Sequence, residues 1–387
     1  MESYLQGFNL ILSLLGVVIF LFFCVQIYYY LCYYSGVIRQ NRKISQGKVQ
    51  FSAEQPPVSI IICARNEEDN LRNFLPKIME QDYPNFEVIL VNDGSEDNTE
   101  GVLNSFAEQY PNLYITKVPI DTNIISRKKL AITIGVKAAK NELLLFTDAD
   151  CYPVSDQWIN LMVRNLGSNT ELVIGYGDYI REKSFIGKLI SYDTLFIAMQ
   201  YFGFAYSGKP YMGVGRNLMY KRSTFYQNKG FAGHLHIASG DDDLLVNKVG
   251  NRENTAIACT AESKTMSVPE ATFAKWLKQK QRHLKSSSLY SPQSRRRIGV
   301  EVITRFGFYM SMVTAIFTFN IVVIGLALLL FAVRYMIQML VVNKTAKKLG
   351  SAKHFVAIIL FDILLPIISL WLLAKNTRIR EGQVCPS

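Results

Sequence analysis

An apolar run in the middle of the chain ends abruptly in two carboxylates: Leu143-Leu144-Leu145-Phe146-Thr147-Asp148-Ala149-Asp150. Such a run predicts a buried strand, and in a strand residues i and i+2 point to the same side. Asp148 and Asp150 can therefore converge on one divalent cation, with phosphate oxygens and water as its remaining ligands. An isolated Asp-x-Asp is more often a surface turn, so this interpretation depends on the segments around it.

The region before this pair alternates between strand and helix patterns. Polar clusters follow the strands, with Arg65-Asn66-Glu67 after the first and Asn92-Asp93-Gly94-Ser95 after the second. This alternation predicts an α/β domain with a mostly parallel sheet and a ligand site at the carboxyl ends of its strands. The Gly-rich turn of dinucleotide-binding enzymes is missing after the first strand, which argues against an oxidoreductase of that kind. The expected strands cover 58–63, 86–91, 113–118 and 143–146, and the expected helices cover 68–80 and 128–140.

Four side chains in this region suit a nucleotide. Asp93 can accept a hydrogen bond from a uracil ring N–H, and Glu67 can reach nucleoside hydroxyls. Either carboxylate could instead cap a helix. Lys128 and Lys129 precede the strand of the carboxylate pair, where an ammonium group could meet a diphosphate. The sequence does not distinguish these two lysines from each other, nor from a solvated helix face.

A second acidic cluster, Gly240-Asp241-Asp242-Asp243, precedes an apolar run. Adjacent carboxylates repel one another, which can raise the pKa of one and suit it to take a proton from a hydroxyl group. Acidic residues in the first turn of a helix would look similar. The cluster is a candidate catalytic base because it accompanies the other segments.

The two ends of the chain are apolar enough to enter a membrane. Of the 387 residues 49% are hydrophobic, and residues 10–32 form a run with one Gln and no charge. That length matches the roughly 20 residues of a spanning helix, and without a visible cleavage site we expect an uncleaved anchor. Residues 306–342 are too long for one span, so we expect two spans with a turn near Asn320. A further span over 355–374 contains Asp362 and Pro366, which predict contact with neighbouring helices or the interface.

Positive charges indicate the orientation of these spans. The first is followed by a tyrosine belt and then by Arg39, Arg42, Lys43 and Lys48, which place the next domain in the cytoplasm. With three C-terminal spans, one group of cations lies inside as the rule requires and a second group lies outside. With two spans, the two groups exchange sides. With three spans the residues inside are Lys344, Lys347, Lys348 and Lys353, and those outside are Lys375, Arg378 and Arg380.

The formal net charge of +11 is concentrated in a segment directly before the C-terminal apolar region. This position favours anionic lipid headgroups or a pyrophosphate as the partner, and argues against nucleic acid. The six cysteines show neither zinc-site nor disulfide-framework spacing. The basic residues are Lys275, Lys278, Lys280, Arg282, Lys285, Arg295, Arg296 and Arg297. The expected organisation is an anchor over 1–35, an α/β domain over 50–270, a basic interfacial segment over 271–300 and transmembrane helices over 301–375.

Taken together, these segments resemble the membrane-bound family 2 glycosyltransferases of the GT-A fold, such as cellulose, hyaluronan and poly-N-acetylglucosamine synthases. The resemblance covers residues 57–283 and implies a Rossmann-like nucleotide-sugar domain. The matching pieces are Val58-Ser59-Ile60-Ile61-Ile62, Arg65-Asn66-Glu67, Val91-Asn92-Asp93-Gly94-Ser95, Thr147-Asp148-Ala149-Asp150, Gly240-Asp241-Asp242 and Gln279-Lys280-Gln281-Arg282-His283.

The resemblance also implies roles for single residues. Asp93 would bind the base, Asp150 would bind Mg²⁺ or Mn²⁺ with Asp148, and Asp242 would be the general base. The segment 213–218 resembles the loop on the acceptor side, through Gly215 and Asn217. The implied nucleotide-sugar ligands are Arg65, Glu67, Asp93, Lys128, Lys129 and Asp148, and the implied catalytic residues are Asp241, Asp242, Gln279 and Arg282.

One position departs from the family pattern of Gln, two residues, Arg and Trp, because His283 stands where Trp is expected. Gln279 and Arg282 are three residues apart and share a helix face, so both can approach diphosphate and acceptor. The missing Trp removes an expected stacking platform for a sugar. Trp276, one turn earlier, could replace it or belong to the core, and His283 is expected to be a packing residue.

The expected reaction is inverting transfer of a hexose or N-acetylhexosamine from a nucleotide diphosphate sugar, UDP-linked by resemblance. Its acceptor would be a hydroxyl of a lipid-linked or growing glycan at the cytoplasmic membrane. A processive synthase that exports its product is the alternative, in which a second copy or a transport partner would complete a channel. A non-catalytic membrane scaffold is the alternative of another class, and the clustered carboxylates argue against it.

Overall fold

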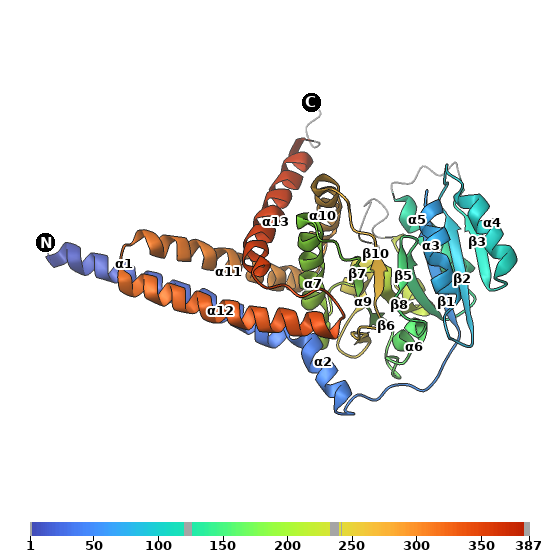
Figure 1. Cartoon of the computed structure of the whole chain (residues 1–387), viewed down its shortest axis with the longest axis horizontal. Helices are drawn as coiled ribbons and strands as arrows, with labels where there is room; N and C mark the ends of the chain where they lie inside the picture. Colours follow the sequence, from blue (N-terminus) through green and yellow to red (C-terminus); the bar gives the residue numbers. More distant parts are fainter. Residues whose placement is uncertain (1, 120–125, 233–239, 241, 383–387) are drawn as a thin grey trace.

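The computed structural model describes the chain except residues 1, 120–125, 233–239, 241 and 383–387. An α/β domain lies at one end of the molecule, and a bundle of long helices projects from it (Figure 1). The strands are β1 (Val58–Ala64), β2 (Phe86–Asn92), β3 (Leu113–Lys117), β4 (Leu143–Asp148), β5 (Cys151–Pro153), β6 (Leu172–Ile174), β7 (Gly177–Tyr179), β8 (Leu218–Lys221), β9 (Thr255–Ile257) and β10 (Thr265–Ser267). The helices of the α/β domain are α3 (Glu68–Met79), α4 (Thr99–Gln109), α5 (Arg127–Ala138), α6 (Trp158–Val163), α7 (Phe185–Tyr206), α8 (Arg222–Gln227), α9 (Asp242–Val249) and α10 (Phe273–Ser287).

The main sheet has seven strands in the order β3-β2-β1-β4-β8-β6-β9. Strands β1 to β4 are parallel, whereas β8 runs antiparallel to both β4 and β6. Because successive side chains of a strand point to opposite faces, Ile60 and Ile62 pack toward α3, α4 and α6, while Ile61 packs toward α5 and α7. A sheet covered on both faces explains the nearly continuous apolar strands. The predicted α/β fold with a largely parallel sheet is confirmed.

A smaller sheet in the order β5-β10-β7 follows the carboxylate pair. Strand β10 pairs antiparallel with β5 and parallel with β7, so that Cys151, Ser267 and Tyr179 lie in one row. Each of these strands has only three residues, which is too short for an alternating pattern to appear in the sequence. The sequence analysis therefore did not predict this sheet.

The N-terminal helix enters the α/β domain through a close helix contact. Helix α1 (Glu2–Tyr28) continues as a π-helix (Tyr29–Tyr34) and α2 (Gly36–Ser45). Here Gly36 and Gly203 of α7 face each other, and a Cβ built at Gly36 would come within 2.8 Å of Gly203 Cα. Only residues without side chains permit this approach. Helix α7 is thereby fixed between the sheet and the N-terminal helix.

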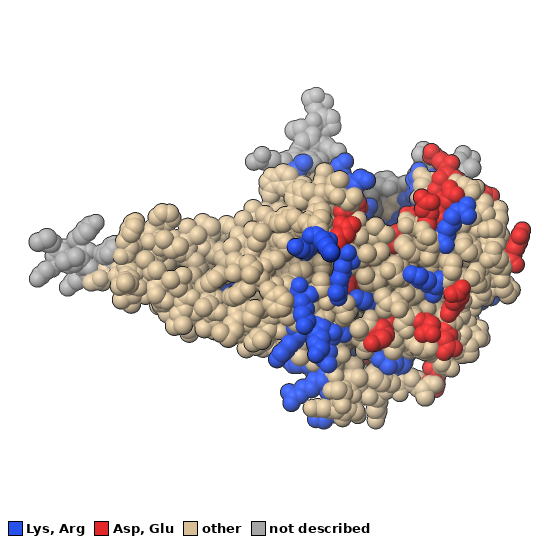
Figure 2. Space-filling view, viewed as in Figure 1, with Lys and Arg blue, Asp and Glu red and all other residues tan. Residues whose placement is uncertain are grey.

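Within the described residues, four helices are long and apolar enough, by length and composition, to cross a membrane: Asn9–Ser45, Pro292–Phe317, Ile321–Lys348 and Ala357–Lys375. The last three belong to α11 (Pro292–Phe317), α12 (Ile321–Lys348) and α13 (Ala357–Gly382). The expected turn at Asn320 is present. Asn320 Oδ1 accepts hydrogen bonds from the backbone N–H groups of Val322 and Val323 at 3.0 and 3.1 Å and so begins α12. The projecting bundle is almost free of charged side chains on the face shown in Figure 2.

The acidic residue predicted to contact neighbouring helices does so. Asp362 of α13 accepts hydrogen bonds from Arg305 Nη1 at 3.2 Å and Arg334 Nη2 at 2.8 Å, and the Tyr309 hydroxyl donates to it at 2.6 Å. The Asp362 carboxylate is fully buried. Since a buried charge is costly unless it is paired, this network specifies how α11, α12 and α13 meet.

Candidate active site

Two loops at the carboxyl edge of the main sheet are joined to each other. Asn66 adopts a left-handed backbone conformation with φ 56°, which Asn tolerates better than most residues. Its backbone N–H donates to Ser95 Oγ at 3.0 Å, and its side-chain oxygen accepts from the backbone N–H of Glu96 at 2.8 Å. The loops that carry Glu67 and Asp93 are therefore held side by side.

Asp93 follows β2 and is buried. Arg127, the first residue of α5, donates from Nε to Asp93 Oδ1 at 2.9 Å. Gly94, with φ 65°, leaves room for this guanidinium, because a Cβ there would come within 3.0 Å of Arg127 Nη2. The sequence analysis selected Asp93 but not Arg127, since nothing in the spacing of positions 93 and 127 indicates that they meet.

Glu67 lies close to the carboxylate pair. Its Oε2 accepts a hydrogen bond from Asn70 Nδ2 at 2.6 Å, and its side chain is half-buried. Burial raises the pKa of Glu67 above its usual value of 4.5; the Asn70 bond opposes this, and Asp150 and Asp148 add to it. Glu67 is therefore close enough to Asp148 and Asp150 to be affected by their negative charges. Arg65, two residues earlier, is exposed.

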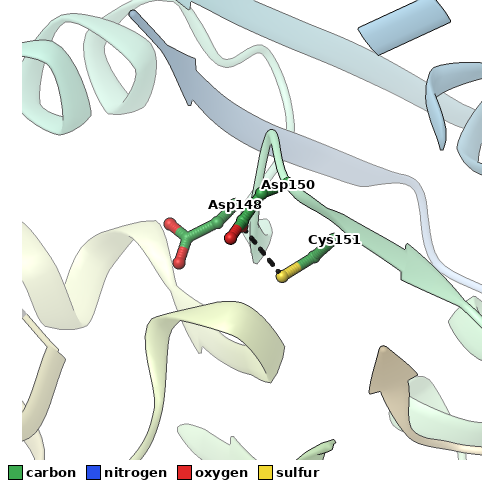
Figure 3. Close-up of side chains that lie close together, drawn as sticks. All are labelled: Asp148, Asp150 and Cys151. Carbon is green, nitrogen blue, oxygen red and sulfur yellow. Dashed lines mark hydrogen bonds between the residues drawn. The ribbon is translucent and has the colours of Figure 1, made fainter. Parts of the chain in front are cut away.

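The carboxylates of Asp148 and Asp150 lie with the Cys151 thiol in one group, whose ligand atoms are all within 4.8 Å of one another (Figure 3). Ser267 Oγ donates to Asp150 Oδ2 at 2.8 Å, which fixes that carboxylate. Burial raises the pKa of the Cys151 thiol well above its usual value, and Asp150 and Asp148 raise it further. The thiol is therefore protonated and donates to Asp150 Oδ1 at 3.3 Å. The remaining carboxylate oxygens are hard ligands, which fit Mg²⁺ or Mn²⁺.

The structure separates the two lysines that the sequence left equivalent. Lys128 Nζ lies 2.9 Å from Asp148 Oδ1, whereas Lys129 is fully buried. Consecutive residues of a helix point about 100° apart, so only one of the two can face the site. Burial alone would raise the pKa of Asp148, but Lys128, with Arg216 and Arg282, outweighs it and lowers that pKa.

A small cavity lies between Asp148 of the carboxylate pair and Asp242 of the second acidic cluster. Its lining includes Lys128, Asp148, Gly215 and Asp242. Asp242 begins α9 and faces the backbone of Gly215, where a Cβ would come within 2.5 Å of Asp242 Cγ. Asp148, Gly215 and Asp242 are far apart in the sequence and therefore meet at one site only in the folded chain.

The two described acidic residues of this cluster, Asp242 and Asp243, differ in environment. Asp243 is buried and accepts hydrogen bonds at 2.6 Å from Ser286 Oγ and from the Tyr290 hydroxyl, which tie α9 to α10 and to the start of α11. Asp241 lies outside the described residues. Of the two described carboxylates, Asp242 is the one at the cavity.

The predicted acceptor role of Asn217 needs correction. Asn217 is fully buried and accepts from Trp158 Nε1 at 3.0 Å, while its amide donates to the carbonyls of Tyr176 and Ser263 at 3.0 and 2.7 Å. All hydrogen-bonding groups of the Asn217 side chain are used within the core, so this residue stabilises the loop and does not face the cavity. Gly215, its neighbour in the same loop, is the residue that reaches the cavity.

The small sheet connects the carboxylate pair to α10. The Tyr179 hydroxyl accepts a hydrogen bond from Gln279 Nε2 at 3.3 Å. Since Cys151, Ser267 and Tyr179 occupy one row of three neighbouring strands, Tyr179 lies about 10 Å from Cys151, at about 4.8 Å per strand. The distance between the carboxylate pair and Gln279 is set by this row. Ser267 and Tyr179 were missed because their strands could not be predicted.

Other residues of α10 differ from the expectation of a free basic segment. Lys280 pairs with Asp193 of α7 at 2.7 Å, and both side chains are about nine-tenths buried, so this lysine is not available to a lipid or a pyrophosphate. Trp276 is a core residue. Arg282 and His283 are both exposed. Nearby protein atoms and the cations Arg282, Arg216, Lys128 and Lys280 lower the pKa of His283 to about 4, so it is neutral at pH 7.

This arrangement, a largely parallel sheet with an Asp-x-Asp pair at its edge, is that of the GT-A fold. Residues 59–228 match the model of the family Glycosyl transferase family 2. The chain therefore carries a family 2 glycosyltransferase domain, as the sequence motifs predicted.

Named relatives agree with this assignment. The chain is 32% identical over 123 residues to glycosyltransferase AglE of Haloferax volcanii, covering 31% of this chain and 39% of that one. It is 34% identical over 101 residues to dolichyl-phosphate beta-glucosyltransferase ALG5A of Trichomonas vaginalis, covering 24% and 30%. For poly-beta-1,6-N-acetyl-D-glucosamine synthase of Staphylococcus epidermidis the identity is 26% over 134 residues, covering 34% and 31%. The matches thus span less than two fifths of the length of these relatives.

A solved structure supports the fold over most of the chain. The mannosyltransferase PcManGT of Pyrobaculum calidifontis, solved with GDP-Man and Mn²⁺, has a TM-score of 0.54 at 17% identity. The comparison covers 87% of this chain and 99% of that one. At this identity the likeness concerns the fold, and it extends beyond the residues that match the family model.

Proposed function

We propose that this protein is an inverting glycosyltransferase. It transfers a hexose or N-acetylhexosamine from a nucleotide diphosphate sugar to a hydroxyl of a membrane-associated acceptor. The observation that carries the proposal is the cavity at which Lys128 and Asp148 meet Gly215 and Asp242. Groups that suit a departing diphosphate thus lie next to a carboxylate that suits an attacking hydroxyl.

The donor half of the site is built from Asp148, Asp150 and Lys128. The two carboxylates would hold Mg²⁺ or Mn²⁺, which supplies positive charge to the diphosphate when bound. Lys128 already pairs with Asp148 and would stabilise the negative charge that develops on the leaving group. Asp93 and Glu67, held by the joined loops, would orient the nucleoside.

The acceptor half centres on Asp242. Its carboxylate would take the proton of the acceptor hydroxyl while the oxygen attacks the anomeric carbon. Attack from the side opposite the diphosphate inverts the configuration at that carbon. Gly215 lets the carboxylate stand at the cavity, and Gln279, held by Tyr179, would border the same region from α10.

A uridine-linked donor is the specific proposal for the nucleotide. Its support is the resemblance of the motifs. The named relatives, a glucosyltransferase and an N-acetylglucosamine polymer synthase among them, support the transferred sugar. The dolichyl-phosphate relative likewise supports a lipid-linked acceptor. We further propose that the domain faces the cytoplasm of a multi-pass protein in the inner membrane, because Arg39, Arg42 and Lys43 follow the first apolar helix.

Donor use tests the proposal. The purified full-length chain in lipid nanodiscs would be incubated with UDP-glucose, UDP-GlcNAc or GDP-mannose, a membrane lipid extract, and Mg²⁺ or Mn²⁺. We expect release of the nucleoside diphosphate from a UDP-sugar that depends on metal and on the extract. Folded protein that releases no nucleotide from any donor would support the scaffold alternative.

Product size separates the two enzymatic candidates. A single addition to a lipid gives one labelled, solvent-extractable species, whereas a processive synthase gives a ladder or a polymer. We expect the extractable species, because the lipid-linked acceptor is the one that the relatives' names support.

A further inference from the structure

Arg216 is a charged residue of the site that the sequence analysis did not assign. It lies in the short η2 helix (Gly215–Asn217), next to the glycine that faces Asp242. Two contacts fix its guanidinium. Arg216 Nη2 donates to the carbonyl of Gly177 at 3.1 Å, and Arg216 Cζ lies 4.3 Å from the centroid of the Tyr179 ring. A stacked and hydrogen-bonded guanidinium is preorganised, so little entropy is lost when it binds an anion.

One nitrogen of this guanidinium remains available. Arg216 Nη1 is buried and has no hydrogen-bond partner among the described residues. No ion pair of Arg216 is found in the described part of the chain either, although Asp148 and Asp150 are near enough for their charges to act on it. A buried cationic N–H without an acceptor is costly, and an anionic ligand would satisfy it.

We propose that Arg216, together with Lys128, binds the diphosphate of the nucleotide sugar. The proposal rests on the proposed function and adds a specific residue to it. In the transfer, the acceptor oxygen bonds to the anomeric carbon, and the bond from that carbon to the phosphate oxygen breaks. The electron pair stays on the diphosphate, and the acceptor proton goes to Asp242. Arg216 stabilises the added negative charge, and Tyr179 keeps the guanidinium in place.

Nucleotide affinities test this role. Binding of UDP and UMP would be measured by calorimetry in the presence of Mg²⁺, because the two ligands differ by the phosphate that Arg216 is proposed to contact. Loss of a charged hydrogen bond in Arg216→Gln should weaken UDP roughly 10- to 100-fold and leave UMP nearly unchanged. Arg216→Lys should recover part of the difference. The exposed Arg72→Gln, on the outer side of α3, is the matched control and should change neither affinity.

Two outcomes overturn the inference: an unchanged preference for UDP in Arg216→Gln, or an equal loss for UDP and UMP. If Arg216→Gln does not fold, Tyr179→Leu removes the stacking surface and Tyr179→Phe keeps it, so only the first should reduce the preference for UDP. If the wild-type protein binds neither nucleotide while the donor panel also fails, the proposed function itself is wrong.

A second, independent observation concerns α13. Helices α1, α11 and α12 run side by side along the projecting bundle, whereas α13 runs crosswise to them (Figure 1). Its residue Asp362 meets Arg305 and Arg334, which lie near the middle of α11 and α12. Helix α13 also packs against α10 and α7 of the α/β domain. One face is buried by these contacts, and the opposite face is apolar and exposed through Leu360 and Trp371 among others.

We infer that α13 lies in the membrane interface on the side of the α/β domain, while α1, α11 and α12 span the bilayer. The occupant of its exposed face is the boundary between headgroups and acyl chains, where Trp is favoured. This arrangement removes the charge conflict of the four-span topology, because every cation after residue 342 then lies on the domain side. These cations are Lys344, Lys347, Lys348, Lys353, Lys375, Arg378 and Arg380.

Cysteine labelling in intact cells tests this topology. Single cysteines would be introduced at Lys48, at Asn320 and near the C-terminus at Gln383 in the full chain without its other cysteines. A membrane-impermeant maleimide should label position 320 in intact cells, and positions 48 and 383 only after the membrane is opened. Labelling of 383 together with 320 would show that α13 spans the membrane and would contradict the inference.

Discussion

Gly215 lies against the carboxylate of Asp242, so closely that a Cβ built on the glycine would come within 2.5 Å of Asp242 Cγ. The two residues are 27 positions apart and belong to different elements, η2 and α9. Their contact places the carboxylate at the cavity that Asp148 also lines. The absence of a side chain at position 215 is therefore a condition for the proposed chemistry.

Gly215→Ala should displace the Asp242 carboxylate and reduce turnover about 10²-fold or more, since small displacements of catalytic groups have effects of this size. The matched control is Gly299→Ala in α11, where nothing lies within 4 Å of the added Cβ. It should be neutral or slightly stabilising. Steady-state nucleotide release by both variants checks this, and normal turnover of Gly215→Ala would show that the contact is unimportant.

Asp150→Asn should lower turnover about 10²-fold or more without unfolding the protein, because it removes one strong electrostatic stabiliser of the diphosphate. The amide oxygen can still accept from Ser267 Oγ, so the local structure should persist. Asp156→Asn, an exposed position in the following turn, is the control and should be fully active. Full activity of the wild type in the presence of a metal chelator would show that the carboxylate pair does not act through a metal.

The environment of the Glu67 carboxylate predicts that the stability of the folded protein depends on pH. Its pKa is raised in the folded state, mainly by burial and further by Asp150 and Asp148, so folding favours the protonated form. Stability should therefore fall as the pH rises from about 4.5 through the folded pKa. Glu67→Gln, which keeps an acceptor for Asn70, should be more stable than the wild type at pH 7 and equal to it below pH 4. Thermal unfolding checks this, and added Mn²⁺ should narrow the difference at pH 7.

The loop between α12 and α13 is bound to β7 by a buried ion pair. Asp178 accepts from Lys264 Nζ at 3.0 Å and from Ser351 Oγ at 2.8 Å, and Lys264 also donates to the carbonyl of Gly350 at 2.7 Å. Asp178→Asn leaves a buried ammonium unpaired and should cost about 3–5 kcal/mol, whereas Ser351→Ala should cost about 1 kcal/mol.

The exposed pair of Lys117 and Glu100 provides a control for this prediction. Glu100→Gln should cost less than about 1 kcal/mol, because water and salt screen an exposed pair. Thermal unfolding in the same detergent compares the three variants. Equal effects of Asp178→Asn and Glu100→Gln would mean that the buried pair does not hold the loop to the domain.

The sequence predicted the parts of the molecule that depend on long, regular patterns. Strands β1, β2 and β4 and the polar clusters after them could be assigned because each run is apolar and ends at an abrupt polar boundary. The pair of three-residue strands β10 and β7 offers no such pattern, so Ser267 and Tyr179 were not found. Arg216 lies within the segment 213–218 but was not predicted as a site residue, since its proposed role depends on the Tyr179 ring against which it stacks.

The sequence also does not predict which of two neighbouring residues with the same chemistry faces the site. Lys128 and Lys129 differ only by their rotation around α5, and which one faces Asp148 depends on how that helix packs on the sheet. The same is true of Asn217, which a motif places at an acceptor loop although three core groups use its amide. Tertiary packing decides such cases.

The most direct test of the central claim compares Asp242→Asn with Asp243→Asn. Asp242→Asn should abolish sugar transfer while its affinity for the nucleotide sugar and its unfolding temperature stay near those of the wild type, because only the proton acceptor is lost. Asp243→Asn should instead lower the unfolding temperature, since Ser286 and Tyr290 donate to that carboxylate. If Asp242→Asn transfers sugar at the normal rate, or loses donor binding as much as transfer, Asp242 is not the base and the cavity is not the site of transfer.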